Sequence, residues 1–439
     1  MRTTCIAFLV GALAVAPSIG GGIVEPETTV PLIQDVDVLV IGGTCGAVAA
    51  AEGAAQSGAK VFLATPGLCL GEDVAGTLRV WAEPDEIGSS DLMGRLFAPA
   101  GQEVSPATSR IYTTPLRVKK ALDTTLLKAG VRFLTGAYAT DVLSDASGLP
   151  AGAVLCDRSG RQAVRAKVII DATARGRLAR LAGAEFTPFP GGTYTVSRVV
   201  IAGSAPECGG TVTRHDEWRP EKDIVQLSSK TTIAPGLYEC VFPLPFADGG
   251  PQAFAEAEQA ARDRTFTATQ LDAADRVCFI PPDHVKSASP CAKERVTADE
   301  LDLGALRPAG IGGVYVLGPL ADVPRPLAAE LARPGFAIRV GARLGRQAAA
   351  DAKSSTIAGE VRRAGRGETG ATADVREVRG TLTQPFVAAT GTIPCEAREL
   401  PVLDEVDLVV AGGGTTGAPA AIGAARHGLS TVVVEQLHE

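Results

Sequence analysis

The residues of this sequence that most clearly indicate a binding function form two glycine-rich turns, at 42–47 and 412–417. Each turn follows an apolar run and precedes an alanine-rich stretch of helical length, after which a second apolar run begins. This order predicts a strand, a turn, a helix and a second strand. Because unpaired N–H groups and partial positive charge gather at a helix N-terminus, both turns are predicted to bind the phosphates of a dinucleotide.

The later copy follows the dinucleotide-binding pattern at every position. Gly412 permits a sharp turn after the strand, Gly414 lets a phosphate approach the backbone, and Gly417 lets the helix pack close to the strand. Glu435, at the end of the second strand, is placed to accept hydrogen bonds from a ribose diol.

The earlier copy departs from the pattern. Gly42 and Gly43 are present, but Thr44 and Ala47 stand at the second and third glycine positions, and Thr65 stands where the acid is expected. The Thr44 hydroxyl can cap the helix, and alanine is tolerated at the last position. Two interpretations remain open, a working nucleotide site and a retained scaffold that binds no nucleotide.

Apolar periodicity and turn residues predict the elements that position these turns. Helices are predicted at 114–129, 254–264 and 335–352, and strands at 131–135, 138–143, 151–157 and 161–166. The regular alternation of strand and helix is lost between 190 and 300, where prolines, charges and short β-like runs predict a second, sheet-containing domain.

Three segments in this order resemble the FAD-dependent oxidoreductases with the glutathione-reductase-like dinucleotide fold. They are GGTCGAVAAA at 42–51, VIIDATARG at 168–176 and VYVLGPLAD at 314–322. The resemblance implies an α/β fold, with a Rossmann-like FAD-binding domain on a parallel sheet, a βαβ start and an inserted α+β substrate domain. A closer likeness to bacterial flavoproteins with tandem units implies that the second copy opens a second unit, truncated here.

This resemblance divides the chain into segments. They are a signal peptide at 1–22, the first part of the FAD-binding domain at 33–189, a substrate domain at 190–305, the closing FAD-binding segment at 306–353, a linker at 354–404, and a second, truncated βαβ unit at 405–439.

The resemblance also implies a set of FAD contacts. They are Gly42, Gly43, Thr44, Cys45, Gly46, Ala47, Thr65, Ala139, Ala172, Thr173, Gly318 and Asp322. Some family positions differ, because Ala174 replaces a glycine and three residues separate Gly318 from Asp322. Arg175 and Arg177 can offset weakened contacts, since guanidinium pairs well with phosphate. Glu72 and Asp73, beside the first turn, are expected to form a solvated turn or a backbone cap.

The chemistry implied is hydride transfer from a small organic substrate to the flavin, which an unknown electron acceptor then reoxidises. His215, Arg117 and His284 are the candidates for acid–base or anion-binding roles. His215 comes first because it combines a titratable type of side chain with the neighbouring Arg214, Asp216 and Trp218. Each has a plainer interpretation as a surface residue. The alternative function is a non-catalytic, flavin-free scaffold that supports a second flavoprotein domain.

Composition excludes several other classes. The net charge is −7 and aromatic residues make up 5%, so a nucleic-acid partner is not expected. The cysteines form no CxxC pair and the four histidines are scattered, so neither a dithiol redox centre nor a metal site is expected. The composition leaves the oligomeric state open.

The first residues, MRTTCIAFLVGALAVAPSIGGG, have one arginine before a short apolar run and small residues. This pattern is typical of a secretory signal and too short for a membrane span. It predicts export to the periplasm, with a cytoplasmic protein carrying an N-terminal extension as the alternative.

Overall fold

The computed structural model describes residues 23–97, 110–218, 235–363, 371–372 and 390–435. The chain divides into two compact units. The larger unit comprises 29–363 and 377–394, and the smaller unit comprises 1–28, 364–376 and 395–439. The predicted signal peptide at 1–22 lies outside the described residues.

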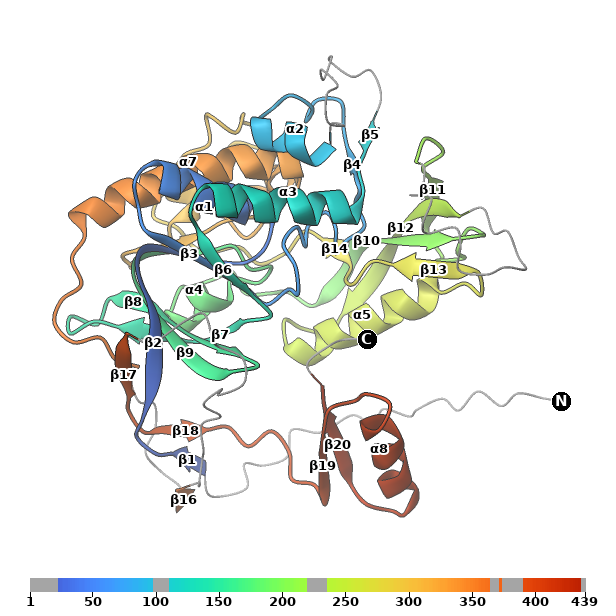
Figure 1. The fold of residues 1–439 in the computed structure, drawn as a ribbon. Helices are drawn as coiled ribbons and strands as arrows, with labels where there is room; N and C mark the ends of the chain where they lie inside the picture. The colour runs from blue at the N-terminus through green and yellow to red at the C-terminus, as the bar shows by residue number, and fades with distance from the viewer. Residues whose placement is uncertain (1–22, 98–109, 219–234, 364–370, 373–389, 436–439) are drawn as a thin grey trace. The chain divides into compact units, whose positions relative to one another are not determined.

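A parallel sheet forms the centre of the larger unit (Figure 1). Its strands, in spatial order, are β6 (Arg132–Thr135), β3 (Val61–Thr65), β2 (Thr28–Ile41), β9 (Gly160–Asp171) and β15 (Val314–Val316). β2 and β3 pair in parallel with Val38 opposite Val61, so the chain must cross over between them, which a helix commonly does. The α/β class and the βαβ start predicted from the sequence are confirmed.

Antiparallel strands extend this sheet. β7 (Tyr138–Ser144) pairs with β8 (Pro150–Asp157), and β8 pairs with the first half of β9. β17 (Gly391–Cys395), within the segment predicted as a linker, pairs with β2.

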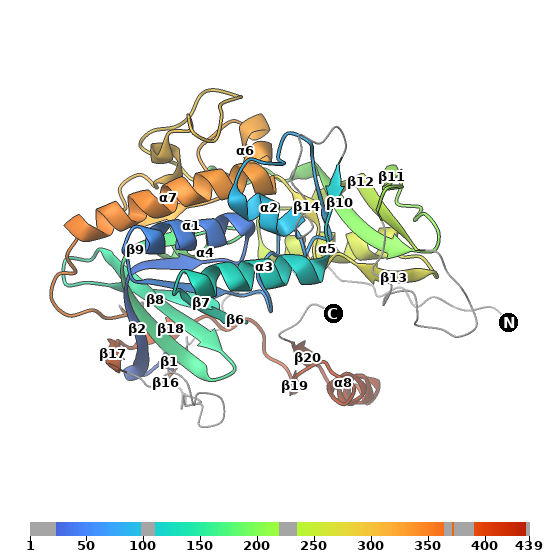
Figure 2. The same ribbon diagram turned by 45° about the horizontal axis from the view of Figure 1, so that its top comes forward.

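Three helices lie on one face of the sheet (Figures 1 and 2). They are α1 (Cys45–Gln56), α3 (Pro115–Lys128) and α7 (Pro334–Ser354), and the short α2 (Asp91–Phe97) and α6 (Arg325–Leu331) lie near their ends. The buried side chains of β2 alternate between faces. Val38 and Val40 belong to the core under α1 and α7, whereas Leu39 and Ile41 belong to the core with α4 (Arg177–Leu181).

α1 and α7 pack at backbone contact because glycines and alanines line both helices. A Cβ atom on Gly345 would lie 2.0 Å from the carbonyl oxygen of Ala50, and one on Gly341 would lie 2.2 Å from that of Gly46. These contacts bring the N-terminal part of α7 to the first turn of α1.

A second, antiparallel sheet lies in the region between 190 and 300, where the sequence predicts short β-like runs. Its strands are β10 (Gly192–Ala202), β11 (Thr211–Arg214), β12 (Gly236–Phe246), β13 (Gln270–Ala273) and β14 (Cys278–Phe279). α5 (Pro251–Thr265) packs on this sheet over a core that includes Phe242 and Phe246. β4 (Trp81–Ala82) pairs with β5 (Ile111–Tyr112), and a 3₁₀ helix spans Leu303–Leu306.

The smaller unit contains two small sheets. β1 (Ile23–Glu25) pairs with β16 (Ala371–Thr372) and with β18 (Arg398–Leu400). β19 (Leu408–Ala411), α8 (Gly417–Arg426) and β20 (Thr431–Val434) form the second βαβ unit, with the two strands in parallel. Along the part of the chain that the structure describes, no helix combines the length and the apolar character that crossing a membrane requires.

Candidate functional site

The turn at 42–47 has the backbone form that its glycines predict. Gly42 has a φ of +127°, and a Cβ atom there would lie 2.5 Å from the carbonyl oxygen of Ala172. A Cβ atom on Gly46 would lie 3.0 Å from the carbonyl oxygen of Ala337 in α7. These two glycines therefore let the turn pass close to the 168–176 segment and to α7.

Thr44 is the N-cap of α1. Its Oγ1 atom accepts a hydrogen bond from the backbone N–H of Ala47 at 3.1 Å, which satisfies one of the unpaired donors of the helix. The threonine in place of the second motif glycine thus acts as the capping residue that its side chain predicts.

Two carboxylates accept hydrogen bonds from two further backbone N–H groups of the turn. The N–H of Gly43 donates to Oε1 of Glu72 at 2.9 Å. The N–H of Cys45 donates to both carboxylate oxygens of Asp73, at 2.9 and 3.1 Å. The interpretation of Glu72 and Asp73 as a backbone cap is confirmed. Two anions of the chain itself therefore lie at the amides predicted to bind a diphosphate.

Burial shifts the titration of groups at this turn. Burial raises the pKa of the Asp73 carboxyl, although the hydrogen bond from the Cys45 N–H opposes this shift. Burial also raises the pKa of the Cys45 thiol well above its ordinary value, and the charge of Asp73 adds to the effect. Cys45 is therefore a buried thiol without nucleophilic character.

A tight turn holds both carboxylates in place. The N–H of Gly71, which has a φ of +84°, donates to the carbonyl oxygen of Gly43 at 2.7 Å. The second carboxylate oxygen of Glu72 forms an ion pair with Arg276 at 3.0 Å. The hydroxyl of Thr77 donates to the carbonyl oxygen of Asp73 at 2.7 Å.

Thr65 lies at the position where the family carries a ribose-binding acid. Its side chain is buried, and its Oγ1 atom accepts a hydrogen bond from the N–H of Gly67 at 3.2 Å. A Cβ atom on Gly43 would lie 2.7 Å from this oxygen. Thr65 is thus enclosed by the turn, and its hydroxyl supports the loop that leads to Glu72.

In the second copy, the carboxylate of Glu435 accepts a hydrogen bond from the N–H of Gly413. A Cβ atom on Gly417 would lie 1.8 Å from the carbonyl oxygen of Gly412, so only glycine fits there. The space beside Gly414 holds no atom of the described residues within 4 Å of such a Cβ position. The backbone of this copy therefore requires the glycines at 412, which has a φ of +101°, and at 417, but not the one at 414.

The 168–176 segment is organised by a buried carboxylate, that of Asp171. It accepts hydrogen bonds from the N–H and hydroxyl of Thr173, at 3.0 and 2.6 Å, and from the N–H of Ala179 at 2.9 Å. Burial raises the pKa of the Asp171 carboxyl. The Ala172 N–H donates to the carbonyl oxygen of Ile41. Ala172 thus lies beside the first turn, and whether it and Thr173 contact FAD stays a prediction.

The arginines near this segment contact protein groups. Nε of Arg177 donates to the carbonyl oxygen of Ala139 at 2.8 Å. Arg175 donates to the carbonyl oxygen of Gly249 at 2.9 Å, and its guanidinium lies 3.7 Å from the ring centre of Phe254. Burial lowers the pKa of the Arg175 guanidinium. Both side chains are therefore held by the scaffold.

The closing segment brings Asp322 and His284 together. Asp322 accepts hydrogen bonds from the N–H and hydroxyl of Ser287, at 2.8 and 3.0 Å. Its other oxygen lies 3.6 Å from Nε2 of His284, which also lies 3.1 Å from the Thr187 hydroxyl. Gly318 has a φ of +132° and starts the turn that leads to Asp322. His284 is 40% exposed, so its ring meets solvent.

His215 is fully buried in an aromatic cluster. Its ring centre lies 4.1 Å from that of Trp81, and its Nδ1 atom lies 3.2 Å from the hydroxyl of Tyr112. Its Nε2 atom has no hydrogen-bond partner within the described residues and lies 3.8 Å from a carboxylate oxygen of Glu239. A buried imidazole with one free nitrogen beside a carboxylate has the elements of an acid–base group.

This cluster joins the two-stranded sheet of β4 and β5 to the second, antiparallel sheet. Trp81 and Tyr112 come from β4 and β5, whereas Glu239 comes from β12, and Trp218 follows His215 in the chain. Tyr112, Glu239 and Trp81 were not predicted from the sequence. The tryptophans of the sequence were a signal for this cluster, because the chain has two and both lie in it.

Leu78 precedes β4 with a φ of 53°, which is unusual for a residue with a side chain.

Arg117 lies in the first turn of α3, where its N–H donates to the Thr114 hydroxyl at 3.3 Å. α3 contributes no residue to the cluster around His215.

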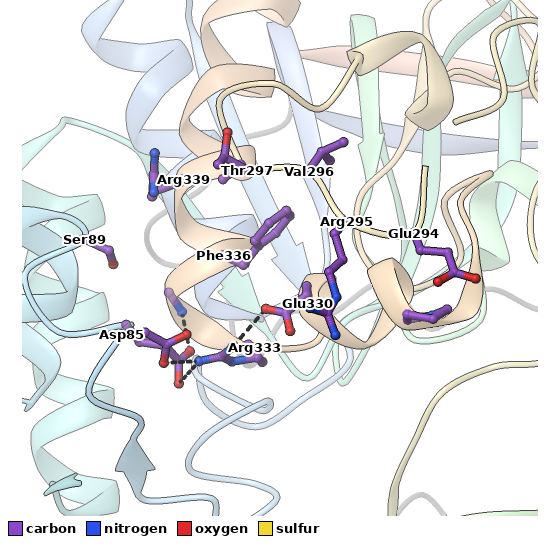
Figure 3. Close-up of a pocket in the computed structure, with 14 residues that line it drawn as sticks. Asp85, Ser89, Glu294, Arg295, Val296, Thr297, Glu330, Arg333, Phe336 and Arg339 are labelled. Atoms are coloured by element: carbon purple, nitrogen blue, oxygen red, sulfur yellow. Dashed lines mark hydrogen bonds and ion pairs between the residues drawn. The ribbon is translucent and has the colours of Figure 1, made fainter. Parts of the chain in front are cut away.

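A cavity of about 450 Å³ lies at the N-terminus of α7 (Figure 3). Arg333 donates to Asp85 and Glu330 and lies 3.5 Å from a carboxylate oxygen of Glu86, so charges of both signs meet there. No residue of 42–47 lines this cavity, and neither does His215. Over the described ranges, the structure gathers no group of three or more His, Cys, Asp and Glu side chains that could hold a metal ion.

Residues 37–189 match the family model described as FAD dependent oxidoreductase. The matched segment is less than half of the chain and contains the first turn, Glu72, Asp73 and the 168–176 segment. No curated protein matches the chain.

Several solved structures are similar to this chain at low identity. A geranylgeranyl bacteriochlorophyll reductase-like protein of Thermoplasma acidophilum has 14% identity and a TM-score of 0.44, over 72% of this chain and 79% of that chain. An aromatic hydroxylase from angucycline biosynthesis has 14% identity and a TM-score of 0.46, over 73% of this chain and 63% of that chain. A flavin-dependent brominase has 14% identity and a TM-score of 0.40, over 73% and 80%.

The family match indicates FAD binding, and the first turn is where the diphosphate of that cofactor would bind. The backbone fits, because the N–H groups of Gly43 and Cys45 already bind anionic oxygens and α1 begins at this point. The side chains of Glu72 and Asp73, however, hold the same N–H groups. The residues thus form an anion-binding turn whose donors are engaged by two carboxylates of the chain.

Proposed function

We propose that the larger unit is an FAD-dependent oxidoreductase that oxidises a small organic substrate by hydride transfer to the flavin. The observation that carries this proposal is the match of 37–189 to the FAD dependent oxidoreductase model, which includes the anion-binding turn. When bound, FAD supplies the two-electron acceptor for such a reaction. A separate electron acceptor, not identified by the sequence, would reoxidise it.

The chain's own residues have two roles in this proposal. The N–H groups of Gly43 and Cys45, at the positive end of α1, bind the diphosphate. His215 exchanges a proton at Nε2, while the Tyr112 hydroxyl fixes the ring through Nδ1. A carboxylate oxygen of Glu239 lies 3.8 Å from Nε2 and faces the nitrogen that exchanges the proton. Because the ring is buried, a substrate reaches it only if a neighbouring side chain moves.

The test is the visible absorption spectrum of the purified chain before and after addition of FAD. A flavin spectrum that persists after removal of free FAD supports the proposal. Anaerobic reduction of that flavin by alcohols, amines and hydroxy acids then identifies the substrate class. The pH profile of reduction by His215→Gln, compared with His284→Gln as the control, assigns the proton-transfer role to His215 if only the first variant loses the pH dependence.

One observation favours a second candidate function. Because Glu72 and Asp73 bind the amides of the first turn, the fold is complete without an external anion at that place. We therefore propose, as the alternative, a non-catalytic and flavin-free scaffold. Protein that is colourless and takes up no FAD at any concentration tested supports this alternative and contradicts the oxidoreductase.

The regular geometry of the second βαβ unit supports the proposal that this chain resembles flavoproteins with tandem units. Export through residues 1–22 is likewise a proposal, and mass spectrometry of the N-terminus of the protein made in a bacterial host tests it.

A further inference from the structure

We infer that Glu72 and Asp73 are an internal competitor of the cofactor. Their carboxylates occupy the place of the FAD diphosphate, and the diphosphate binds only when both are displaced. This inference rests on the proposed function for the identity of the ligand, and on the hydrogen bonds of the turn for the competition itself.

The competition follows from the number of donors. Each backbone N–H group has one hydrogen, and those of Gly43 and Cys45 both point at carboxylate oxygens at normal hydrogen-bond distance. A third donor of the α1 N-terminus, the N–H of Ala47, is bound by the Thr44 hydroxyl. A diphosphate oxygen can take up the first two groups only after the carboxylates leave them.

The two carboxylates are held in position by groups outside the turn. Gly71 is fixed by its hydrogen bond to the Gly43 carbonyl oxygen, and a Cβ atom there would lie 2.6 Å from a Val118 methyl group. Arg276, between β13 and β14, binds the outer oxygen of Glu72. Release of Glu72 therefore also breaks a contact with the second sheet.

Charge strengthens the competition. The Glu72 side chain is only 12% exposed and Asp73 is half-buried, so solvent and salt screen these carboxylates less than they screen surface carboxylates. A diphosphate at the same amides would meet two like charges, of which Arg276 neutralises one. Neutral side chains of the same shape remove this repulsion and keep the backbone unchanged.

The experiment compares FAD affinity of the full chain with that of the variant E72Q/D73N. The control is E52Q/D123N, which removes two carboxylates from α1 and α3 outside the turn. Binding is followed by quenching of flavin fluorescence, and circular dichroism checks the fold. A second titration with ADP, a diphosphate without a flavin, measures the anion site separately.

The inference predicts that E72Q/D73N binds FAD and ADP at least about tenfold more tightly than the parent, whereas the control variant equals the parent. Equal or weaker FAD binding by E72Q/D73N, with a parent that binds FAD well, overturns the inference and leaves the oxidoreductase standing. If no variant binds FAD but E72Q/D73N alone gains ADP binding, the inference holds and the proposed cofactor is wrong. If E72Q/D73N gains neither ligand, the inference is overturned.

The single variants E72Q and D73N keep the test decisive if the double variant does not fold. Each single variant is then expected to bind ADP more tightly than the parent, with a gain in affinity of less than about tenfold. Two single variants that both bind like the parent overturn the inference.

Discussion

The backbone N–H of Gly43 donates a hydrogen bond to the carboxylate of Glu72 at 2.9 Å. In the second glycine turn, the N–H of Gly413 at the equivalent position donates to the carboxylate of Glu435. An acid thus satisfies the same amide in both copies, although it comes from the end of the second strand in one and from the following loop in the other. In the first copy Thr65 replaces the strand-end acid, and Glu72 accepts the hydrogen bond of this amide instead.

Replacement of Glu72 by alanine is expected to lower the free energy of unfolding by about 1–3 kcal/mol, because it leaves the buried N–H of Gly43 and the guanidinium of Arg276 without their partner. Urea unfolding followed by circular dichroism measures the change. Glu52→Ala, which breaks a partly exposed ion pair with Arg95, is the control and is expected to cost less than about 1 kcal/mol. Equal losses in the two variants would contradict the assigned role of Glu72.

The elements around the first turn could be predicted because their signals are local. The apolar run before Gly42, the alanine-rich helix and the second apolar run define the end of β2, α1 and β3 within a few residues, whereas β2 begins at Thr28, well before the apolar run. Thr44 as an N-cap follows from its hydroxyl and its place before the helix. For Glu72 and Asp73 the sequence left two expectations, a solvated turn or a backbone cap, because acids repel a diphosphate.

The partners of the candidate site residues could not be predicted, because they come from distant parts of the chain. His215 was identified by side-chain type, but Tyr112 and Glu239 reach it from β5 and β12 through the packing of two sheets. Arg276 reaches Glu72 in the same way. No periodicity or spacing in one sequence encodes such pairs.

Asp171→Ala is expected to lower the free energy of unfolding by about 3 kcal/mol or more. It removes the acceptor of two backbone N–H groups, those of Thr173 and Ala179, and of one hydroxyl, in a place closed to water. Differential scanning calorimetry of the variant measures the loss. A change below about 1 kcal/mol would show that water or another side chain replaces the carboxylate.

The pH dependence of stability provides a separate test of Asp171. Because burial raises its pKa in the folded state above the ordinary value of 3.8, the folded state holds the proton more tightly than the unfolded state. The contribution of this group is therefore fully present below the unfolded pKa and is lost as pH rises through the folded pKa. The stability of the parent relative to Asp171→Asn should thus decline as the pH rises above the ordinary value of 3.8. A difference that is constant or grows with pH would contradict this sign.

Gly345→Ala is expected to destabilise the larger unit by about 1–3 kcal/mol, because the new Cβ atom would lie 2.0 Å from the carbonyl oxygen of Ala50 and force α1 and α7 apart. Gly94→Ala in α2 is the matched control. A Cβ atom at position 94 would have no neighbouring atom within 4 Å. The substitution is therefore expected to stabilise the protein by up to about 1 kcal/mol, because alanine has the higher helix propensity. Thermal unfolding of both variants gives the comparison, which fails if their midpoints shift in the same direction.

The double variant H215F/Y112F separates a catalytic role of His215 from a structural one. It replaces both partners of the Nδ1 hydrogen bond by apolar rings of similar size, so the stability is expected to change by less than about 1 kcal/mol. Tyr112→Phe alone leaves a buried ring nitrogen without its partner and is expected to be less stable than the double variant. If His215 transfers a proton, the rate at which the substrate reduces the flavin falls by about 10²–10⁴-fold in the double variant. The substrate used is the alcohol, amine or hydroxy acid that reduces the flavin of the parent. A stable double variant that keeps the parent rate would identify His215 as a core residue, because the removal of its titratable ring would then have no chemical consequence.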